Sequence, residues 1–269
     1  QYYLRGFNLD HGTDFASWVD GMPVNMPTHA HGQGYTDLNF LIPELVQAIQ
    51  YRKGTFAAED GDFASAGSAR IQLKDKLDQG MATVTLGEHN FVRTLVADST
   101  ELAAGPLLYA IEGTYNDGPW DHPQHHKKVN ALLRHGVQDG ATRHSFTAML
   151  YSARWDSTDQ VPQRAIDSGE IGRFGAIDPS DGGHSQRTSL SWQGTRVLDD
   201  GEWQAGLYAI DSRLSLFSNF TYFLDDEANG DQALQAEKRL VLGGQVQRTW
   251  TAPLAGLESR HTLGLQWRH

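Results

Sequence analysis

The sequence predicts a mainly β protein, in which a globular α+β region precedes antiparallel strands of a transmembrane β-barrel. Three observations support this fold class. From about residue 81 onward, apolar and polar residues alternate in strand-length segments between turn residues. The polar positions carry charged and amide side chains, where the core of a soluble sandwich would be apolar. Short and long connections also alternate, as do the periplasmic turns and extracellular loops of outer-membrane barrels.

Composition excludes several other classes of protein. The chain has 269 residues, no cysteine and a formal net charge of −11. Without cysteine there is no disulfide, no thiolate metal site and no cysteine nucleophile. The acidic balance argues against a nucleic-acid partner, which requires a basic face. No segment approaches the ~20 apolar residues of a transmembrane helix, and Gln1 does not open a signal peptide.

The first region, up to about residue 78, is irregular and rich in Gly, Pro, Asp and His. Its one helical signal covers residues 43–49, where Pro43 takes the first helical position and Glu44 complements the helix N-terminus. A short strand is expected over residues 50–54, where Gly54 ends it. A further strand over residues 69–75 closes the region before the barrel begins.

The second region contains nine expected strands. In residues 107–115, for example, Tyr109 and Ile111 share the apolar face, whereas Glu112 and Thr114 share the polar one. Single-chain bacterial barrels have even numbers of strands, so nine indicate part of a barrel. The longest connection, residues 153–185, is expected to contain a short helix at 164–169. The nine segments are residues 81–88, 91–100, 107–115, 127–138, 143–152, 187–195, 203–223, 240–250 and 259–268.

Four motifs in the first region are similar to those of one family. They are Leu-Arg-Gly-Phe at residues 4–7, Trp-Val-Asp-Gly-Met-Pro-Val-Asn at 18–25, Pro-Glu-Leu-Val through Arg-Lys-Gly at 43–54, and a glycine-containing stretch at 58–68. Each motif is weak alone. Because they occur in order within about 70 residues and precede alternating strands, the chain resembles the TonB-dependent outer-membrane receptors.

The resemblance implies a plug domain at residues 1–78 and, at residues 79–269, about nine of roughly 22 barrel strands. It implies a bacterial outer-membrane protein that takes up a scarce ligand: an iron–siderophore, a metal chelate or a cobalamin-like compound. The implied partners are the TonB inner-membrane complex, outer-membrane lipid and this small molecule. No permanent cofactor is implied, because a metal chelate would be the transported ligand. The family's TonB box and later strands are not in the sequence, so a fragment is implied.

The family's plugs carry arginines that pair with barrel glutamates. By resemblance, Arg5 and Arg52 take this locking role, and Glu112 is an available partner on the polar face of its strand. An arginine buried in the lumen requires such a carboxylate. The alternative is that both arginines are ordinary solvated side chains.

Histidines suggest where a ligand binds. His29 and His31 lie two residues apart in an extended segment and are positioned to share a metal ion. The alternative is turn histidines that face water. No HExxH motif, GxSxG elbow or P-loop is present, so no enzyme is predicted. The ligand-binding candidates are His29, His31, Gln33, Tyr35, His122, His125, His126 and His184.

Two other functions compete with uptake. A soluble β-rich module that binds metal or carbohydrate would also show one apolar and one polar face on its strands. A passive porin-like channel would have the same barrel strands, but it would not need the plug motifs.

Overall fold

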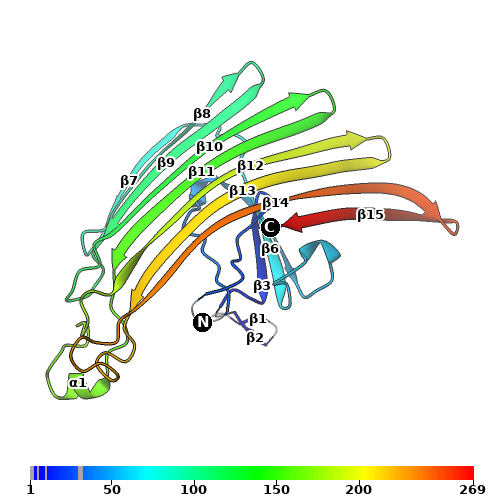
Figure 1. The fold of residues 1–269 in the computed structure, drawn as a ribbon. Coiled ribbons are helices and arrows are strands. Elements are labelled where there is room, and N and C mark those ends of the chain that lie inside the picture. Colours follow the sequence, from blue (N-terminus) through cyan, green and yellow to red (C-terminus); the bar gives the residue numbers. More distant parts are fainter. Residues whose placement is uncertain (1–2, 5, 10, 30–32) are drawn as a thin grey trace.

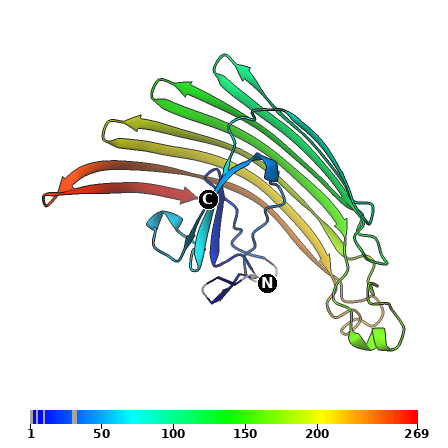
Figure 2. The same cartoon turned by 180° about the vertical axis from the view of Figure 1, so that it is seen from behind.

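The computed structural model describes residues 3–4, 6–9, 11–29 and 33–269. In this part of the chain, a curved antiparallel sheet bends around a smaller N-terminal unit, which ends with residue 73 (Figures 1 and 2). We call this large sheet the strand wall. The N-terminal unit lies on its concave side. The mainly β fold class is confirmed.

The N-terminal unit is built on a four-stranded mixed sheet with the order β4-β3-β6-β5. Strands β3 and β6 are parallel, and β3 turns into β4 through Asp20 and Gly21. Its elements are β1 (Tyr3–Leu4), β2 (Phe7–Asn8), β3 (Phe15–Val19), β4 (Met22–Pro23), η1 (Pro43–Leu45), β5 (Val46–Lys53), η2 (Ala58–Asp60) and β6 (Gly67–Leu73).

The helix expected over residues 43–49 is wrong beyond its first turn. Pro43–Leu45 form a single 3₁₀ turn, and the chain is already a strand from Val46 onward. A helix of seven residues has too few hydrogen bonds to offset the entropy of nucleation. Strand β5 instead gains an antiparallel partner in β6, with Val46 opposite Leu73 and one irregularity between Val46 and Ala48.

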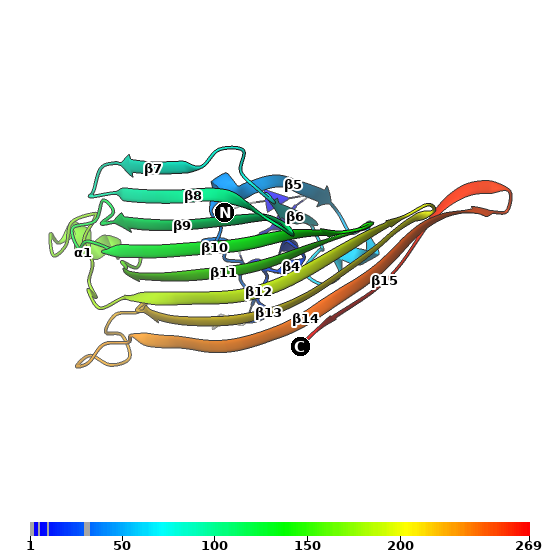
Figure 3. The same ribbon diagram turned by 90° about the horizontal axis from the view of Figure 1, so that it is seen from above.

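The strand wall has nine strands among the described residues, in simple sequence order from β7 to β15, as predicted (Figure 3). The strand expected over 203–223 ends earlier, at Ser218, and the short helix in the longest connection is α1 (Gln163–Asp167). The strands are β7 (Met81–Leu86), β8 (Val92–Leu102), β9 (Gly105–Asn116), β10 (His126–Asp139), β11 (Thr142–Asp156), β12 (Gly182–Leu198), β13 (Gly201–Ser218), β14 (Ala233–Leu254) and β15 (Leu257–Arg268).

The connections of the wall differ at its two ends. At one end the strands are joined by two-residue turns, such as 140–141 and 199–200. At the other end lie the connections 117–125, 157–181 and 219–232, the second of which contains α1. This is the predicted alternation. Among the described residues, no helix is long and apolar enough to cross a membrane.

The two faces of the wall have opposite character. Large apolar side chains on the outer face are exposed, including Ile111, Leu150 and Leu190. Their sequence neighbours on the inner face, among them Glu112 and Ser189, are buried. The faces follow the alternation of the sequence, because successive strand residues point to opposite sides. A continuous apolar outer face is what a lipid-facing wall requires.

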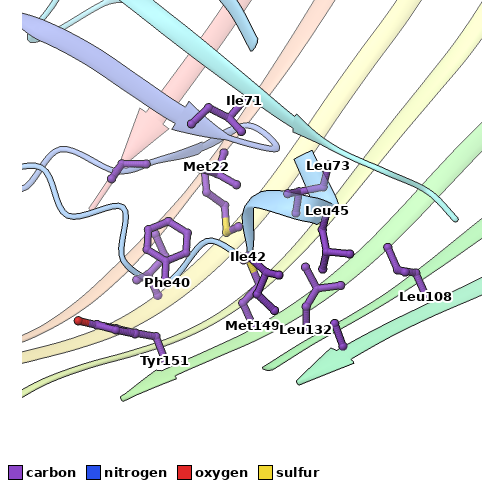
Figure 4. Packing of buried hydrophobic residues seen from close by; sticks show 14 of the residues in the cluster. Met22, Phe40, Ile42, Leu45, Ile71, Leu73, Leu108, Leu132, Met149 and Tyr151 are labelled. Carbon is purple, nitrogen blue, oxygen red and sulfur yellow. The ribbon is translucent and has the colours of Figure 1, made fainter. Parts of the chain in front are cut away.

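The N-terminal unit packs on several transverse rows of inner-face residues, and we call the central one the belt row. Its members lie directly opposite one another from strand to strand and are all buried. Around this row, Ile42, Leu45 and Met22 of the N-terminal unit join Leu132 and Met149 in one hydrophobic cluster (Figure 4). The belt row consists of Ala97, Ala110, Leu132, Met149, Ser189, Ile210 and Val241.

Candidate functional site

A cavity of about 250 Å³ lies between the N-terminal unit and the wall, toward the end with the long connections. We call it the outer cavity. Both parts of the molecule supply its lining, so a bound molecule would contact both at once. The N-terminal unit contributes Tyr35, Asp37 and Asn39. The wall contributes His126, Tyr151, Ala153, Trp155, Ser185 and Leu214.

Tyr35 connects the outer cavity to strand β14. Its hydroxyl donates a hydrogen bond to the Glu237 carboxylate. Burial, reinforced by this carboxylate, raises the pKa of Tyr35, so the phenol remains a donor. The backbone of Tyr35 pairs with Met26, and a Cβ at the preceding Gly34 would lie 2.1 Å from the Met26 carbonyl oxygen. Glycine is therefore required where this loop closes.

The first ionic contact between the two parts runs from Glu44 to the wall. Arg93 of β8 donates to both carboxylate oxygens of Glu44, at 2.7 and 2.9 Å. The same guanidinium pairs with Glu112 of β9, whose side chain is 1% exposed and also receives Lys128 at 2.9 Å. The hydrogen bonds from Arg93 hold the pKa of Glu44 below its usual value. The four charges balance, which buried ions require.

The second ionic contact starts at the β3–β4 turn. Both Asp20 and Gly21 have positive φ, +46° and +73°, as a two-residue type I′ hairpin demands. The Asp20 carboxylate accepts hydrogen bonds from Arg134 of β10 and from the Leu73 amide. Arg134 also donates to Asp75, at 2.9 and 3.1 Å. Burial raises the pKa of Asp20, and the Arg134 charge opposes that rise.

In the structure, Arg52 pairs within the N-terminal unit. Its guanidinium contacts Glu59 and Asp60, which belong to the N-terminal unit itself, and not Glu112. Glu112 does face the unit, but its partners are Arg93 and Lys128. In both ionic contacts the N-terminal unit supplies the carboxylate and the wall supplies the arginine, the reverse of the expected polarity. Arg5 lies outside the described residues.

The histidine candidates are dispersed. His126 lines the outer cavity, and His29 packs edge-on against Tyr35 with ring centroids 5.7 Å apart. His125 pairs with Asp156 on the exposed surface. His122 has a buried Nε2 with no partner in the described part of the chain.

Two candidates do not line the outer cavity, and one lies outside the described residues. His184 is exposed on the outer face of β12, and Gln33 is exposed on its loop. His31 lies outside the described residues, so the proposed His29–His31 metal pair cannot be placed. Within the described ranges, no group of three His, Asp or Glu side chains is arranged to hold a metal ion.

The two longest connections are joined by a buried polar cluster. Asn219, fully buried, donates a hydrogen bond from its side-chain amide to Asp178 and another from its backbone amide to Asp159. Asp181 accepts a hydrogen bond from Gln232 at 3.0 Å. Burial and the adjacent Asp159 carboxyl raise the pKa of Asp181 to about 7 against the effect of that amide.

Sequence reasoning missed most of the residues that form this site. Asp37, Asn39, Tyr151 and Trp155 line the outer cavity without belonging to any motif. Alternation places Tyr151 on the inner face, but only the register of β11 against β12 sets it opposite Arg187. Charge alternation on predicted strands was the available signal for Arg93 and Arg134.

A family model described as TonB-dependent Receptor Plug Domain matches residues 1–68. This match covers all but the last five residues of the N-terminal unit and confirms the resemblance found in the motifs. TonB-dependent receptors are transport proteins of the outer membrane and not enzymes. No curated protein matches the chain.

Solved receptor structures share the fold of almost the whole chain. The unliganded ferric citrate transporter FecA is 14% identical with a TM-score of 0.74, over 98% of this chain and 39% of that one. The siderophore receptor PiuA from Acinetobacter baumannii is 14% identical with a TM-score of 0.70, over 94% and 37%. The copper transporter OprC is 16% identical with a TM-score of 0.64, over 88% and 36%. The chain therefore spans less than half the length of these structures.

Proposed function

We propose that this chain, a TonB-dependent receptor plug domain followed by nine strands with the fold of a receptor barrel, serves in the TonB-energised uptake of an extracellular metal chelate. The outer cavity is its ligand site. The observation that carries the proposal is the shared lining of this cavity, with Tyr35, Asp37 and Asn39 on one side and Tyr151 and Trp155 on the other. A ligand held there contacts the N-terminal unit and the strand wall at the same time.

The exposed outer face of the wall supports a place in the outer membrane. Its exposed apolar side chains include Leu133 on β10, Leu207 on β13 and Leu240 on β14. A soluble metal- or carbohydrate-binding module would have to bury a patch of this size. The long connections lie next to the outer cavity, so this end faces outward.

The ligand class rests on similarity and on the lining. The similar structures are named for transport of ferric citrate, siderophores and copper. Aromatic rings and neutral hydrogen-bonding groups predominate in the outer cavity, a lining that suits an organic chelate with a polar periphery. The transported metal arrives within the chelate and is cargo. TonB is the proposed source of energy.

Uptake by living cells tests the proposal. Bacteria that produce the protein in its full length are supplied with ⁵⁵Fe-citrate, with ⁵⁵Fe bound to a tris-catecholate, or with Cu²⁺. We expect at least one probe to accumulate, only when TonB is present, and Trp155→Ala to weaken its binding about tenfold. A Leu207→Ala variant on the outer face is the matched control. Equal accumulation with and without TonB for every probe would refute the proposed function.

A further inference from the structure

A second cavity, of about 1,010 Å³, lies on the other side of the belt row. We call it the inner cavity. It separates the sheet of the N-terminal unit from β12 to β15, near the two-residue turns 199–200 and 255–256. Its volume is at the upper end of the ~300–1,000 Å³ typical of ligand pockets.

The inner cavity is walled by rows of glutamine. Gln193, Gln245 and Gln266 belong to one transverse row, and Gln204 lies directly opposite Gln247 in the next. Gln50 and Gln72 face them from the N-terminal unit. Side-chain amides both donate and accept hydrogen bonds without carrying charge. Charged side chains, among them Arg52, Arg70 and Glu202, also line the cavity, so its wall as a whole is polar and suits a hydrated solute.

The belt row separates the two cavities. Its apolar character is interrupted at β12. Six of the seven residues in the row are apolar, and the seventh is Ser189 of β12. Along the inner face of β12, Ser185 lines the outer cavity and Gln193 lines the inner one. Between them lie Arg187, Ser189 and Ser191. Polar side chains thus continue from one cavity to the other on this strand.

Two polar side chains at this crossing have atoms without partners. The Ser189 hydroxyl has no hydrogen-bond partner in the described part of the chain, although the residue is 1% exposed. Arg187 is 6% exposed, and its Nε and Nη2 likewise have none. Its guanidinium lies 4.4 Å above the Phe40 ring of the N-terminal unit. Buried groups of this kind are rare and costly to leave unsatisfied.

Strands β8 and β10 hold the N-terminal unit more firmly than β12 does. On β8 to β10, the ion pairs Glu44–Arg93 and Asp20–Arg134 join it to the wall. On β12, the contacts are the Phe40 ring over Arg187 and the close approach of Gly21 to Gln193. The unit can therefore separate from β12 without breaking an ion pair, and it also has to release hydrogen bonds to β14 and β15, such as those of Tyr35 with Glu237 and of Arg268 with Asn25.

We propose that the inner face of β12, from Ser185 to Gln193, is the track along which the ligand passes from the outer to the inner cavity. This inference rests on the proposed uptake function. The N-terminal unit stays attached to β8–β10 while it leaves β12, and the ligand then satisfies the freed donors. Because Arg187 and the serine hydroxyls offer donors, the ligand class is an oxygen-rich chelate with anionic or other acceptor groups at its surface.

Single cysteines test the track directly, because the chain has none of its own. Ser185→Cys, Ser189→Cys and Gln193→Cys are labelled with 2-aminoethyl methanethiosulfonate in cells given each of the three probes above, with and without a protonophore. The matched control is Ala110→Cys, in the same belt row on β9. We expect positions 185 and 193 to react in both states. Position 189 should react at least tenfold faster in energised cells, and position 110 should stay protected.

A bulky substitution gives the second readout. Ser189→Leu completes the apolar row and removes an unpartnered hydroxyl, so it should not lower the melting temperature below that of Ala110→Leu. We expect Ser189→Leu to bind the imported probe within twofold of the unmodified protein but to import it at least tenfold more slowly. Ala110→Leu should import normally.

The outcomes separate the two proposals. If the unmodified protein imports no probe in a TonB-dependent way, the uptake function fails, and the track fails with it. If it imports a probe and Ser189→Leu imports equally well, the track alone is refuted. Equal labelling of positions 189 and 110 in energised cells, or labelling of position 189 that is independent of energy, also refutes the track.

Discussion

The contact between Asp20 and Arg134 gives the sharpest energetic prediction. Arg134→Met keeps the apolar stem of the side chain but leaves the Asp20 carboxylate, 5% exposed, without its buried counter-ion. Removing one partner of a buried ion pair costs about 3–5 kcal/mol. At ~1.4 kcal/mol per factor of ten, the local opening equilibrium of β3 and β4 should rise roughly 100- to 4,000-fold. The Leu73 amide, which also donates to Asp20, becomes exposed in the same opening.

Asp20→Asn serves as the second arm of a double-mutant cycle. Asparagine tolerates the positive φ of this turn and keeps the oxygen that accepts from the Leu73 amide. Arg134 retains Asp75 as its counter-ion, so this variant alone should cost only about 1 kcal/mol. The double variant should be more stable than Arg134→Met, because it has no unpaired buried carboxylate.

Hydrogen–deuterium exchange of the lipid-embedded protein measures these openings in β3 and β6, with β13 as the internal control. Since the pKa of Asp20 is already raised by burial, protonation relieves the Arg134→Met penalty, which should be larger at pH 8 than at pH 5. If Arg134→Met and the double variant exchange equally fast at pH 8, the reasoning about the unpaired carboxylate is wrong.

Three further predictions concern ionisable groups. Arg93 lowers the pKa of Glu44, so the contribution of Glu44 to stability is present above its unfolded pKa and is lost as the pH falls through the lowered value. Melting temperatures of the unmodified protein and Glu44→Gln should therefore differ at pH 7 and converge in acid. A difference that stays constant with pH would contradict this. The pKa of Asp181 is raised to about 7, so the long connections should lose stability as the pH rises from about 4 to about 7. In limited proteolysis, the rate of cleavage in these connections should differ between pH 5 and pH 8 in the unmodified protein but not in Asp181→Asn. Tyr35→Phe removes the hydrogen bond to Glu237 and should speed amide exchange in residues 33–35 by about tenfold, equivalent to ~1.4 kcal/mol, without affecting β10.

The strands could be predicted because alternation is a local property. The contrast between apolar Tyr109 and Ile111 and charged Glu112 is sufficient to assign two faces. The structure places Glu112 on the opposite side of β9 from Tyr109 and Ile111. Residues 43–49 could not be assigned in this way, because a short apolar segment after a proline is compatible with either helix or strand. The partner strand β6 determines the outcome there.

The site could not be predicted because it depends on register and on which charges meet. Resemblance drew attention to Arg52, whereas the contacts with the wall use Asp20 and Glu44. An arginine on a plug can pair with a carboxylate of its own domain as readily as with the barrel, and sequence does not distinguish these. The seven residues of the belt row come from seven strands and form one line only after six registers are known.

The belt row also has a mechanical meaning. Residues on one face of a strand repeat about every 7 Å, so the apolar row itself is only about that thick, and buried polar residues such as Arg187 and Arg134 lie in the rows on either side of it. Under the proposed uptake function, an apolar closure this narrow opens with only a short displacement of the N-terminal unit.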